Sequence, residues 1–335
     1  MNRARLDMNE NPFDLPVEVK RSILEKAVSL PFNRYYAEMG GPAGAGADRL
    51  AERIASMNGV EPGMVTLGNG SDELIMLNAT VADPRGRIIV STPTFGMYSK
   101  AARASGRLLV EVPMNERFEP DLSRLLEEAR GPGSLVFVCR PNNPTGNLCD
   151  IEVVESLLRE TGATIVVDEA YYEFCGDTVA HLLDHFPRLV VMRTMSKAWG
   201  LAGLRLGYML ASPEYTARVQ EAKMPFNVNV LTQMIALEVL NRSDLVERSV
   251  AAIREERAWL ARALDGIEGV TVFPSVTNFL LVRPRVDARE LRASLRELGV
   301  YVRLVDDPSG YIRVAVGSRR ENMDAVAALR RLVSG

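Results

Sequence analysis

The chain is poor in the residues that build disulfide frameworks and metal centres. Its 335 residues include three cysteines and two histidines. Cys139, Cys149 and Cys175 are an odd number without a Cys-x-x-Cys spacing, so we expect free thiols in a reducing cytoplasm. His181 and His185 stand four residues apart without further ligands nearby, which favours a solvated helix face over a metal pair. The sequence therefore predicts no metal site.

The chain also lacks a strong charge of one sign and any long hydrophobic run. The net charge of −3 gives nucleic-acid binding no electrostatic support. No apolar stretch is long enough to cross a membrane, and Met1–Arg5 leads into polar sequence rather than a signal peptide. The 47% hydrophobic and 25% charged content is typical of a globular protein with a sizeable core.

What the sequence does contain is an alternation of short β-rich runs and helical stretches. The expected strands are Arg87–Ser91, Leu108–Val112, Leu135–Cys139, Thr164–Val167, Leu189–Arg193 and Gly207–Ala211. Helical stretches such as Asp121–Arg130 and Ile151–Thr161 lie between most of them. The alternation predicts an α/β fold with a mostly parallel sheet covered by helices on both faces.

The pattern changes after about Pro225 and indicates a smaller α+β unit. Its expected elements are helical Leu231–Leu264, strands Val270–Phe273 and Asn278–Val282, helix Ala288–Leu298, and strands Val300–Arg303 and Tyr311–Val316. We therefore predict three parts. Residues 1–35 form an arm on the small domain or a partner subunit, residues 36–225 a large domain, and residues 226–335 a small domain.

One lysine stands between two stretches that both read as core strands. Lys197 lies among small and hydroxyl-bearing residues, with Leu189–Met192 before it and Leu206–Leu210 after it. Burying an ammonium group is costly, so burial favours the neutral amine, which is the nucleophilic form. A lysine that forms a Schiff base needs this property.

Polar or aromatic residues follow several expected strands at the point where each strand ends. Asp168 ends one strand, Asn143 and Phe95 follow two others, and Lys197 follows a fourth. Open α/β sheets bind ligands at the carboxyl ends of their strands, so these side chains are expected to meet at one edge.

Taken singly, each segment has an ordinary interpretation as well. Gly68–Glu73 opens the helical run Leu74–Val81, either as a plain N-cap or as an anion site. Arg140–Gly146 is either a strand-to-helix connector or a rigid turn that presents asparagines to a ligand. Asp168 is either a helix cap or ion-pair partner, or a carboxylate that faces a protonated heterocycle nitrogen.

In this order, Pro141–Gly146, Asp168–Tyr171 and Ser196–Arg205 resemble the motifs of fold-type I pyridoxal-phosphate (PLP) enzymes, specifically class I/II aminotransferases. The family with the greatest resemblance is that of the histidinol-phosphate aminotransferases. The likeness runs from Leu6–Pro12 to Tyr311–Gly317. It implies a large domain with a mostly parallel seven-stranded sheet, a smaller α+β domain, and PLP as the cofactor.

The resemblance also assigns roles around the cofactor ring. Lys197 would hold PLP as a Schiff base and move a proton. Asp168 would keep the pyridine nitrogen protonated, Asn143 and Tyr171 would bind the ring O3′, and Phe95 would stack on the ring. The residues that would hold the phosphate are Ser71, Asp72, Thr194, Ser196 and Arg205.

Substrate and subunit contacts are implied in the same way. Arg313 would bind the carboxylate of the amino donor, Arg303 the phosphate of the substrate, and Asn11 is assigned to the substrate pocket. Tyr35 matches a tyrosine that reaches the PLP phosphate of a neighbouring subunit. The expected assembly is therefore a homodimer with shared active sites.

The chain departs from the family pattern in two places. Family members usually carry a segment before the Asn9–Pro12 motif that contributes to the substrate pocket, whereas five residues precede Leu6 here. We expect that wall to be absent or rebuilt. The loop Gly40–Gly46 is expected to be flexible and near the active site.

Four functions remain open at this point. The first is transamination between histidinol phosphate and 2-oxoglutarate in histidine biosynthesis. The second is the same reaction on another amino acid, such as an aromatic one, and the third is a PLP lyase such as threonine-phosphate decarboxylase. A PLP-sensing module of a transcription regulator is the fourth and weakest, because the catalytic lysine is present and no DNA-binding domain is attached.

Overall fold

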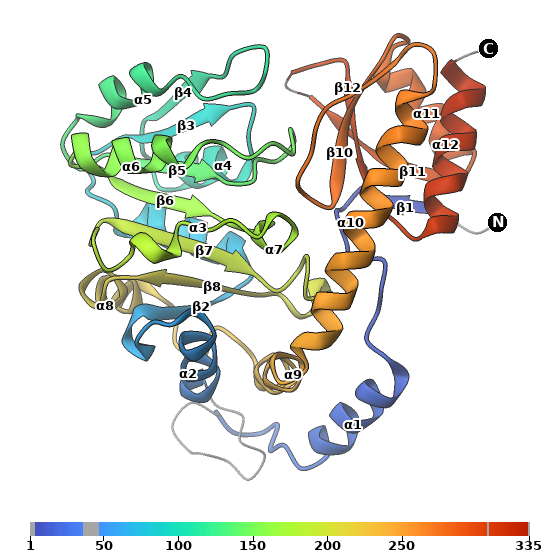
Figure 1. Ribbon diagram of the computed structural model, residues 1–335. Coiled ribbons are helices and arrows are strands. Elements are labelled where there is room, and N and C mark those ends of the chain that lie inside the picture. Colours follow the sequence, from blue (N-terminus) through green and yellow to red (C-terminus); the bar gives the residue numbers. More distant parts are fainter. Residues whose placement is uncertain (1–3, 36–46, 307, 334–335) are drawn as a thin grey trace.

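The computed structural model describes residues 4–35, 47–306 and 308–333. Two sheets organise this part of the chain, one of seven strands and one of five (Figure 1). The loop Gly40–Gly46, expected near the active site, lies outside the described residues. Among those residues, no helix is long and apolar enough to cross a membrane.

The larger sheet has the strand order β2-β8-β7-β6-β5-β3-β4. The strands are β2 (Val65–Asn69), β3 (Ile88–Thr92), β4 (Leu109–Pro113), β5 (Leu135–Cys139), β6 (Thr164–Asp168), β7 (Leu189–Thr194) and β8 (Leu206–Ala211). Strands β7, β6, β5, β3 and β4 run parallel, while β8 is antiparallel to both β7 and β2. The predicted seven-stranded, mostly parallel sheet is thus confirmed.

Helices cover both faces of this sheet because its central strands are apolar on both sides. The helices are α2 (Ala47–Asn58), α3 (Ser71–Val81), α4 (Met97–Ala104), α5 (Leu122–Ala129), α6 (Ile151–Glu160), α7 (Tyr172–Cys175) and α8 (Pro213–Ala222), with 3₁₀ turns η1 (Pro62–Met64), η2 (Ala180–Leu182) and η3 (Ala202–Leu204). On β6, Val166 packs in one apolar cluster with residues of α3, α4 and α8, whereas Ile165 and Val167 pack in the cluster that contains residues of α2, α5 and α6. The alternation along the strand therefore sets the two layers.

The smaller sheet has the order β1-β11-β12-β10-β9. Its strands are β1 (Ala4–Leu6), β9 (Val270–Val272), β10 (Phe279–Pro284), β11 (Val300–Val305) and β12 (Tyr311–Ala315), and the accompanying helices are α10 (Ser243–Asp265), α11 (Ala288–Glu297) and α12 (Arg319–Val333). The first strand, β1, pairs with β11, which lies almost 300 positions later in the sequence. The division of the chain at residues 35 and 225 stays a prediction.

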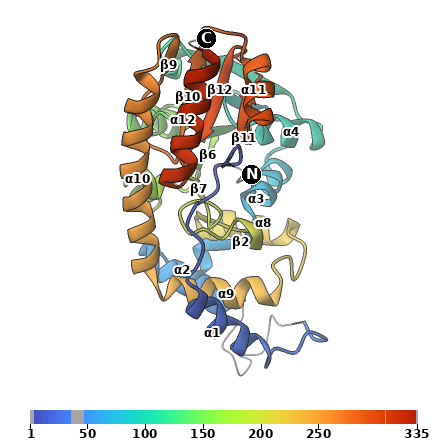
Figure 2. The same ribbon diagram turned by 90° about the vertical axis from the view of Figure 1, so that its right-hand side faces the viewer.

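The helical stretch predicted as Leu231–Leu264 is two helices, α9 (Val230–Leu240) and α10, because the chain turns at Asn241 and Arg242. Helix α1 (Val17–Ala27) packs on α9 through Val19 and Ile23. Figure 2 shows residues 7–16 as the blue trace that runs from the smaller sheet down to α1.

The carboxyl ends of the parallel strands point toward the smaller sheet (Figure 1). Two residues that follow these strands contact the smaller sheet, since Tyr171 meets Phe279 of β10 and Asn143 is hydrogen-bonded to Arg313 of β12. This edge is the place where sequence reasoning expects the ligand.

Candidate active site

Lys197 lies three residues beyond the end of β7, in the turn that leads toward η3. Its side chain is half-buried, and its Nζ donates a hydrogen bond to the Met8 carbonyl oxygen at 3.0 Å. Burial, and next the positive charge of Arg313, lower the pKa of Lys197 to about 8. A substantial fraction of the amine is therefore neutral near physiological pH, as the sequence led us to expect.

Asp168 is the last residue of β6 and is 2% exposed. Its Oδ2 accepts a hydrogen bond from the Tyr98 hydroxyl at 2.8 Å and its Oδ1 accepts one from the Ala170 N–H at 3.1 Å. Burial raises the pKa of Asp168 to about 6. No cation in the described ranges forms an ion pair with this carboxylate, and a buried carboxylate served by neutral donors suits a cationic partner supplied by a ligand.

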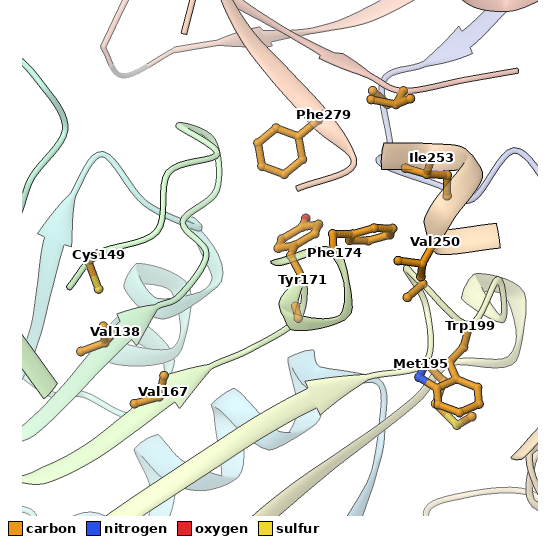
Figure 3. Packing of buried hydrophobic residues seen from close by; sticks show 14 of the residues in the cluster. Val138, Cys149, Val167, Tyr171, Phe174, Met195, Trp199, Val250, Ile253 and Phe279 are labelled. Carbon is orange, nitrogen blue, oxygen red and sulfur yellow. The ribbon is translucent and has the colours of Figure 1, made fainter. Parts of the chain in front are cut away.

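Tyr171 and Asn143 lie between Asp168 and the smaller sheet. The Tyr171 hydroxyl accepts a hydrogen bond from Asn9 Nδ2 at 3.1 Å, and burial raises the pKa of Tyr171 to about 12. Asn143 Oδ1 accepts a hydrogen bond from Arg313 Nη1 at 2.7 Å. Figure 3 shows the Tyr171 ring below Phe279 of β10, so this residue touches both sheets.

An anion cradle forms where helix α3 begins. The N-cap residue Gly70 has no side chain to cap the first turn, so the N–H groups of Ser71 and Asp72 are available to a ligand. Arg205 Nη2 pairs with Asp72 Oδ2 at 3.1 Å, and Nη1 donates to Ser196 Oγ at 3.4 Å. A Cβ added at Gly70 would lie 2.5 Å from Arg205 Nη2, so a side chain there would fill the cradle.

The hydroxyl of Thr194 completes this group. Thr194 is the last residue of β7 and is 3% exposed, and its Oγ1 accepts a hydrogen bond from the Ser196 N–H at 3.1 Å. A helix N-terminus, a guanidinium group and two hydroxyls suit a phosphate.

Two arginines stand directly opposite each other on antiparallel strands. Arg303 of β11 is in register with Arg313 of β12. Arg313 Nη2 donates to the Asp7 carbonyl oxygen at 2.8 Å, and its Nε is buried with no partner in the part of the chain that the structure describes. Arg303 is exposed and forms no ion pair within the ranges that the structure describes. Like charges in register destabilise a sheet, so a bound anion would relieve the pair.

Phe95, Asn11 and Tyr35 are three further residues predicted for the site. Phe95 is half-buried and meets the Tyr98 ring edge-on, with 5.8 Å between ring centroids. Asn11 Nδ2 donates to the Ala198 carbonyl oxygen at 3.0 Å and to Ser249 Oγ at 2.8 Å, so its contact with substrate stays a prediction. Tyr35 is 83% exposed and stacks on Phe226, and its role in a partner's active site also stays a prediction.

Sequence reasoning missed three contributors. Tyr98, which hydrogen-bonds Asp168, comes three residues after Phe95, and this spacing places the two residues close together at the start of α4. Asn9 and Met8 belong to the N-terminal motif, but no periodicity marks them. Asn9 adopts a positive φ of 52°, a conformation that asparagine tolerates better than most residues.

Comparison with known proteins places this arrangement in a family. The family model described as aminotransferase class I and II matches residues 3–329. The chain belongs to the class I and II aminotransferase family and has its fold-type I architecture.

Two relatives illustrate the likeness. The chain is 42% identical over 334 residues to a histidinol-phosphate aminotransferase of Thermococcus gammatolerans, covering 99% of this chain and 93% of the relative. The structure resembles that of histidinol-phosphate aminotransferase from Sinorhizobium meliloti in complex with pyridoxal-5'-phosphate. That match has a TM-score of 0.86 at 25% identity and covers 99% of this chain and 91% of the other.

A third likeness concerns the fold alone. The L-threonine-O-3-phosphate decarboxylase of Porphyromonas gingivalis superposes with a TM-score of 0.83 at 23% identity, covering 99% of both chains.

Proposed function

We propose that this protein is a PLP-dependent aminotransferase that transfers an amino group between histidinol phosphate and 2-oxoglutarate. The observation that carries the choice of substrate is the in-register pair Arg303 and Arg313, of which Arg313 lies close enough to Lys197 to lower its pKa. Both proposed substrates are anions with an amino or keto group nearby. Relatives named for this activity support it over nearly the full length of the chain. We place the reaction in histidine biosynthesis and in the cytoplasm, in line with three unpaired cysteines.

The residues present fit PLP. Lys197 would hold it covalently, the buried carboxylate of Asp168 would face its ring nitrogen, and Phe95 would lie against the ring. The phosphate would be held by the cradle of Ser71, Asp72, Thr194, Ser196 and Arg205. When bound, PLP supplies an electron sink that stabilises negative charge on the α-carbon of the substrate.

The protein's own groups handle the proton and the substrate. Once its amine is free, Lys197 Nζ can accept a proton and return it, because a pKa of about 8 is close to the working pH. Arg313 is held by Asn143 and by the Asp7 carbonyl, so its guanidinium plane is fixed before substrate arrives. Asn143 and Tyr171 would donate to the ring oxygen O3′.

Removing Arg303 should weaken binding of the phosphorylated substrate. Arg303→Ala is expected to lower kcat/KM for histidinol phosphate by about 10- to 100-fold, because one charge-assisted contact contributes roughly 1.5–3 kcal/mol. With histidinol, which lacks the phosphate, the effect should largely vanish. Steady-state kinetics on both amino donors measures this. Arg283→Ala, at an exposed arginine on β10 of the same sheet, is the matched control. An equal loss on both donors would contradict the assignment.

Filling the cradle should weaken cofactor binding. Gly70→Ala adds a Cβ against Arg205 and forces alanine to a φ of 79°, so we expect the Kd for PLP to rise about tenfold or more. A titration followed by absorbance reports the Kd. Gly203→Ala is the control because an added Cβ there meets nothing within 4 Å. Equal Kd values for the two variants would argue against a phosphate site at this helix.

A homodimer with shared active sites is part of the proposal. The arm carries exposed apolar side chains, among them Val17, Leu24, Phe32 and Tyr35, which a partner subunit would cover. If Tyr35 completes the partner's site, Tyr35→Ala and Lys197→Ala proteins, each impaired alone, should regain activity when their subunits are mixed. Mixed dimers as inactive as either parent would refute the sharing.

Half-reactions distinguish the proposed aminotransferase from the alternative, a PLP lyase. With glutamate in single turnover, a transaminase converts PLP to pyridoxamine phosphate and releases 2-oxoglutarate. Release of CO₂ from threonine phosphate, without a keto acid, would instead identify a decarboxylase. Phenylalanine and tyrosine as amino donors test the aromatic alternative.

A further inference from the structure

Glu173 is a half-buried residue whose carboxylate the proposed chemistry does not use. It lies on the short helix α7, directly after the segment that carries Asp168 and Tyr171. Its Oε1 accepts a hydrogen bond from Trp199 Nε1 at 2.8 Å, while its Oε2 is buried and has no hydrogen-bond partner among the described residues. An unsatisfied buried oxygen lowers the free energy of unfolding, so keeping this carboxylate in place destabilises the folded protein.

The hydrogen bond joins the two segments that carry the chemistry. Trp199 comes two residues after Lys197, and Glu173 comes two residues after Tyr171. The backbone connection between β6 and β7 ends with the Glu169 N–H, which donates to the Met192 carbonyl oxygen at 2.8 Å. The side-chain bond therefore extends the connection between the two segments past the edge of the sheet.

The Trp199 side chain is 6% exposed and packs in the large apolar cluster, but it also borders open space. A cavity of about 250 Å³ adjoins it, lined by the residues around Asn11, the turn Ala198–Gly200 and helix α10. Because the indole borders this cavity on one side, the hydrogen bond at Nε1 adds a directional restraint to the apolar contacts of the ring. Figure 3 shows Trp199 next to Met195, with Phe174 and Val250 above them.

The other end of the bond is anchored more firmly. Arg254 of α10 donates from Nη2 to the Glu173 carbonyl oxygen and from Nε to the Phe174 carbonyl oxygen, both at 2.9 Å. On the opposite side, Asn11 Nδ2 donates to the Ala198 carbonyl oxygen at 3.0 Å. The turn that bears Lys197 is thus held between the N-terminal segment and α7.

We propose that Glu173 is a positioning residue that acts through Trp199 to hold the turn bearing Lys197 in a fixed relation to Asp168 and Tyr171. The inference rests on the proposed function, in which Lys197 and Asp168 must reach the two ends of the same cofactor ring. The role requires only an acceptor at Oε1. An amide oxygen accepts as a carboxylate does, so glutamine should preserve the role and alanine should not.

The test compares Glu173→Ala, Glu173→Gln and Trp199→Phe in the PLP-bound protein. Phenylalanine keeps most of the ring volume and removes the donor. The first readout is the pH midpoint of the absorption band that reports the bond between Lys197 and PLP. The second readout is whether the change in kcat/KM comes from kcat or from KM. Glu173→Ala and Trp199→Phe should each shift the midpoint in the same direction and lower kcat about tenfold, with KM little changed.

Two comparisons distinguish a positioning role of Glu173 from an effect on the stability of the protein alone. The double variant Glu173→Ala/Trp199→Phe should be no worse than either single variant, because both remove the same bond. Glu173→Gln should keep the wild-type midpoint even if its melting temperature falls. Trp259→Phe, on α10, is the matched tryptophan control and should leave the midpoint unchanged.

A midpoint unchanged in Glu173→Ala, or additive effects in the double variant, would overturn the inference. If wild-type protein takes up no PLP and gives no absorption band, the proposed function itself fails. Wild-type behaviour in the alanine variant of a protein that does bind PLP removes only the role of Glu173.

Discussion

Alanine at position 197 is expected to leave a folded protein that forms no covalent link to PLP and has no transaminase activity. The variant removes the residue proposed as both nucleophile and proton-transfer group, so kcat should fall by at least about 10²- to 10⁴-fold. The loss of the absorption band near the visible edge, together with mass spectrometry after borohydride reduction, checks the covalent link. Lys223→Ala is the control, since that lysine is also half-buried but donates to Asn227 rather than to a predicted site residue.

In protein from which PLP has been removed, the pKa of Lys197 should lie below the ordinary value for a lysine. Burial lowers the pKa of Lys197 from 10.5 to about 8. The unfolded chain then binds more protons than the folded protein between these values, so stability should rise as pH increases from about 8 to 10.5. Lys197→Met should flatten that part of the curve, measured by denaturant unfolding at several pH values. A wild-type curve that falls with pH in this window would contradict a buried amine.

Asp168→Asn is expected to lower kcat by about 10²- to 10³-fold while PLP still binds. A neutral amide cannot keep the ring nitrogen protonated, so the ring loses its capacity to stabilise negative charge. Stopped-flow single turnover with glutamate measures the chemical step directly. Asp168→Glu tests whether a carboxylate alone suffices. Retention of full activity in the asparagine variant would exclude the assigned role.

The asparagine variant should also be more stable than wild type without PLP. Burial raises the pKa of Asp168 from 3.8 to about 6, so the folded protein binds the proton more tightly than the unfolded chain. The stability from this group is full below about pH 4 and is lost as pH rises through 6, which leaves a penalty at pH 7 on the order of 2–3 kcal/mol. The asparagine side chain carries no charge, so the variant should recover part of this penalty. Equal melting temperatures of the wild-type protein and the asparagine variant at pH 7, both without PLP, would contradict this prediction.

Much of the large sheet could be predicted because its strands are short apolar runs bounded by turn residues. All six strands predicted there match the observed bounds to within one residue, and Leu135–Cys139 matches β5 at both ends. Strand β2 was missed because Val65–Asn69 includes a glycine and leads straight into helix α3, which made the segment read as a helix start. Edge strands of this kind carry a weak local signal.

The positions of the residues proposed to face the ring followed from the same logic, whereas the positions of their hydrogen-bond partners did not. Asp168 and Lys197 could be placed because parallel strands bring their carboxyl ends to one edge. That Tyr98 donates to Asp168, or that the Met8 carbonyl accepts from Lys197, depends on contacts across 70 and 189 positions of sequence. No local pattern encodes such a pairing.

The sequence by itself determined the alternation of strands and helices, the family motifs and the residue types at the carboxyl edge, because these depend on local spacing. Only the tertiary structure decided that Arg303 faces Arg313 and that Glu173 binds Trp199 beside Lys197. The physical reason is that register between distant strands and the burial that sets each pKa arise from the packed fold as a whole. A lysine among apolar residues predicts a reactive amine. Its pKa of about 8 arises only in the folded protein, where Lys197 is buried and lies near Arg313.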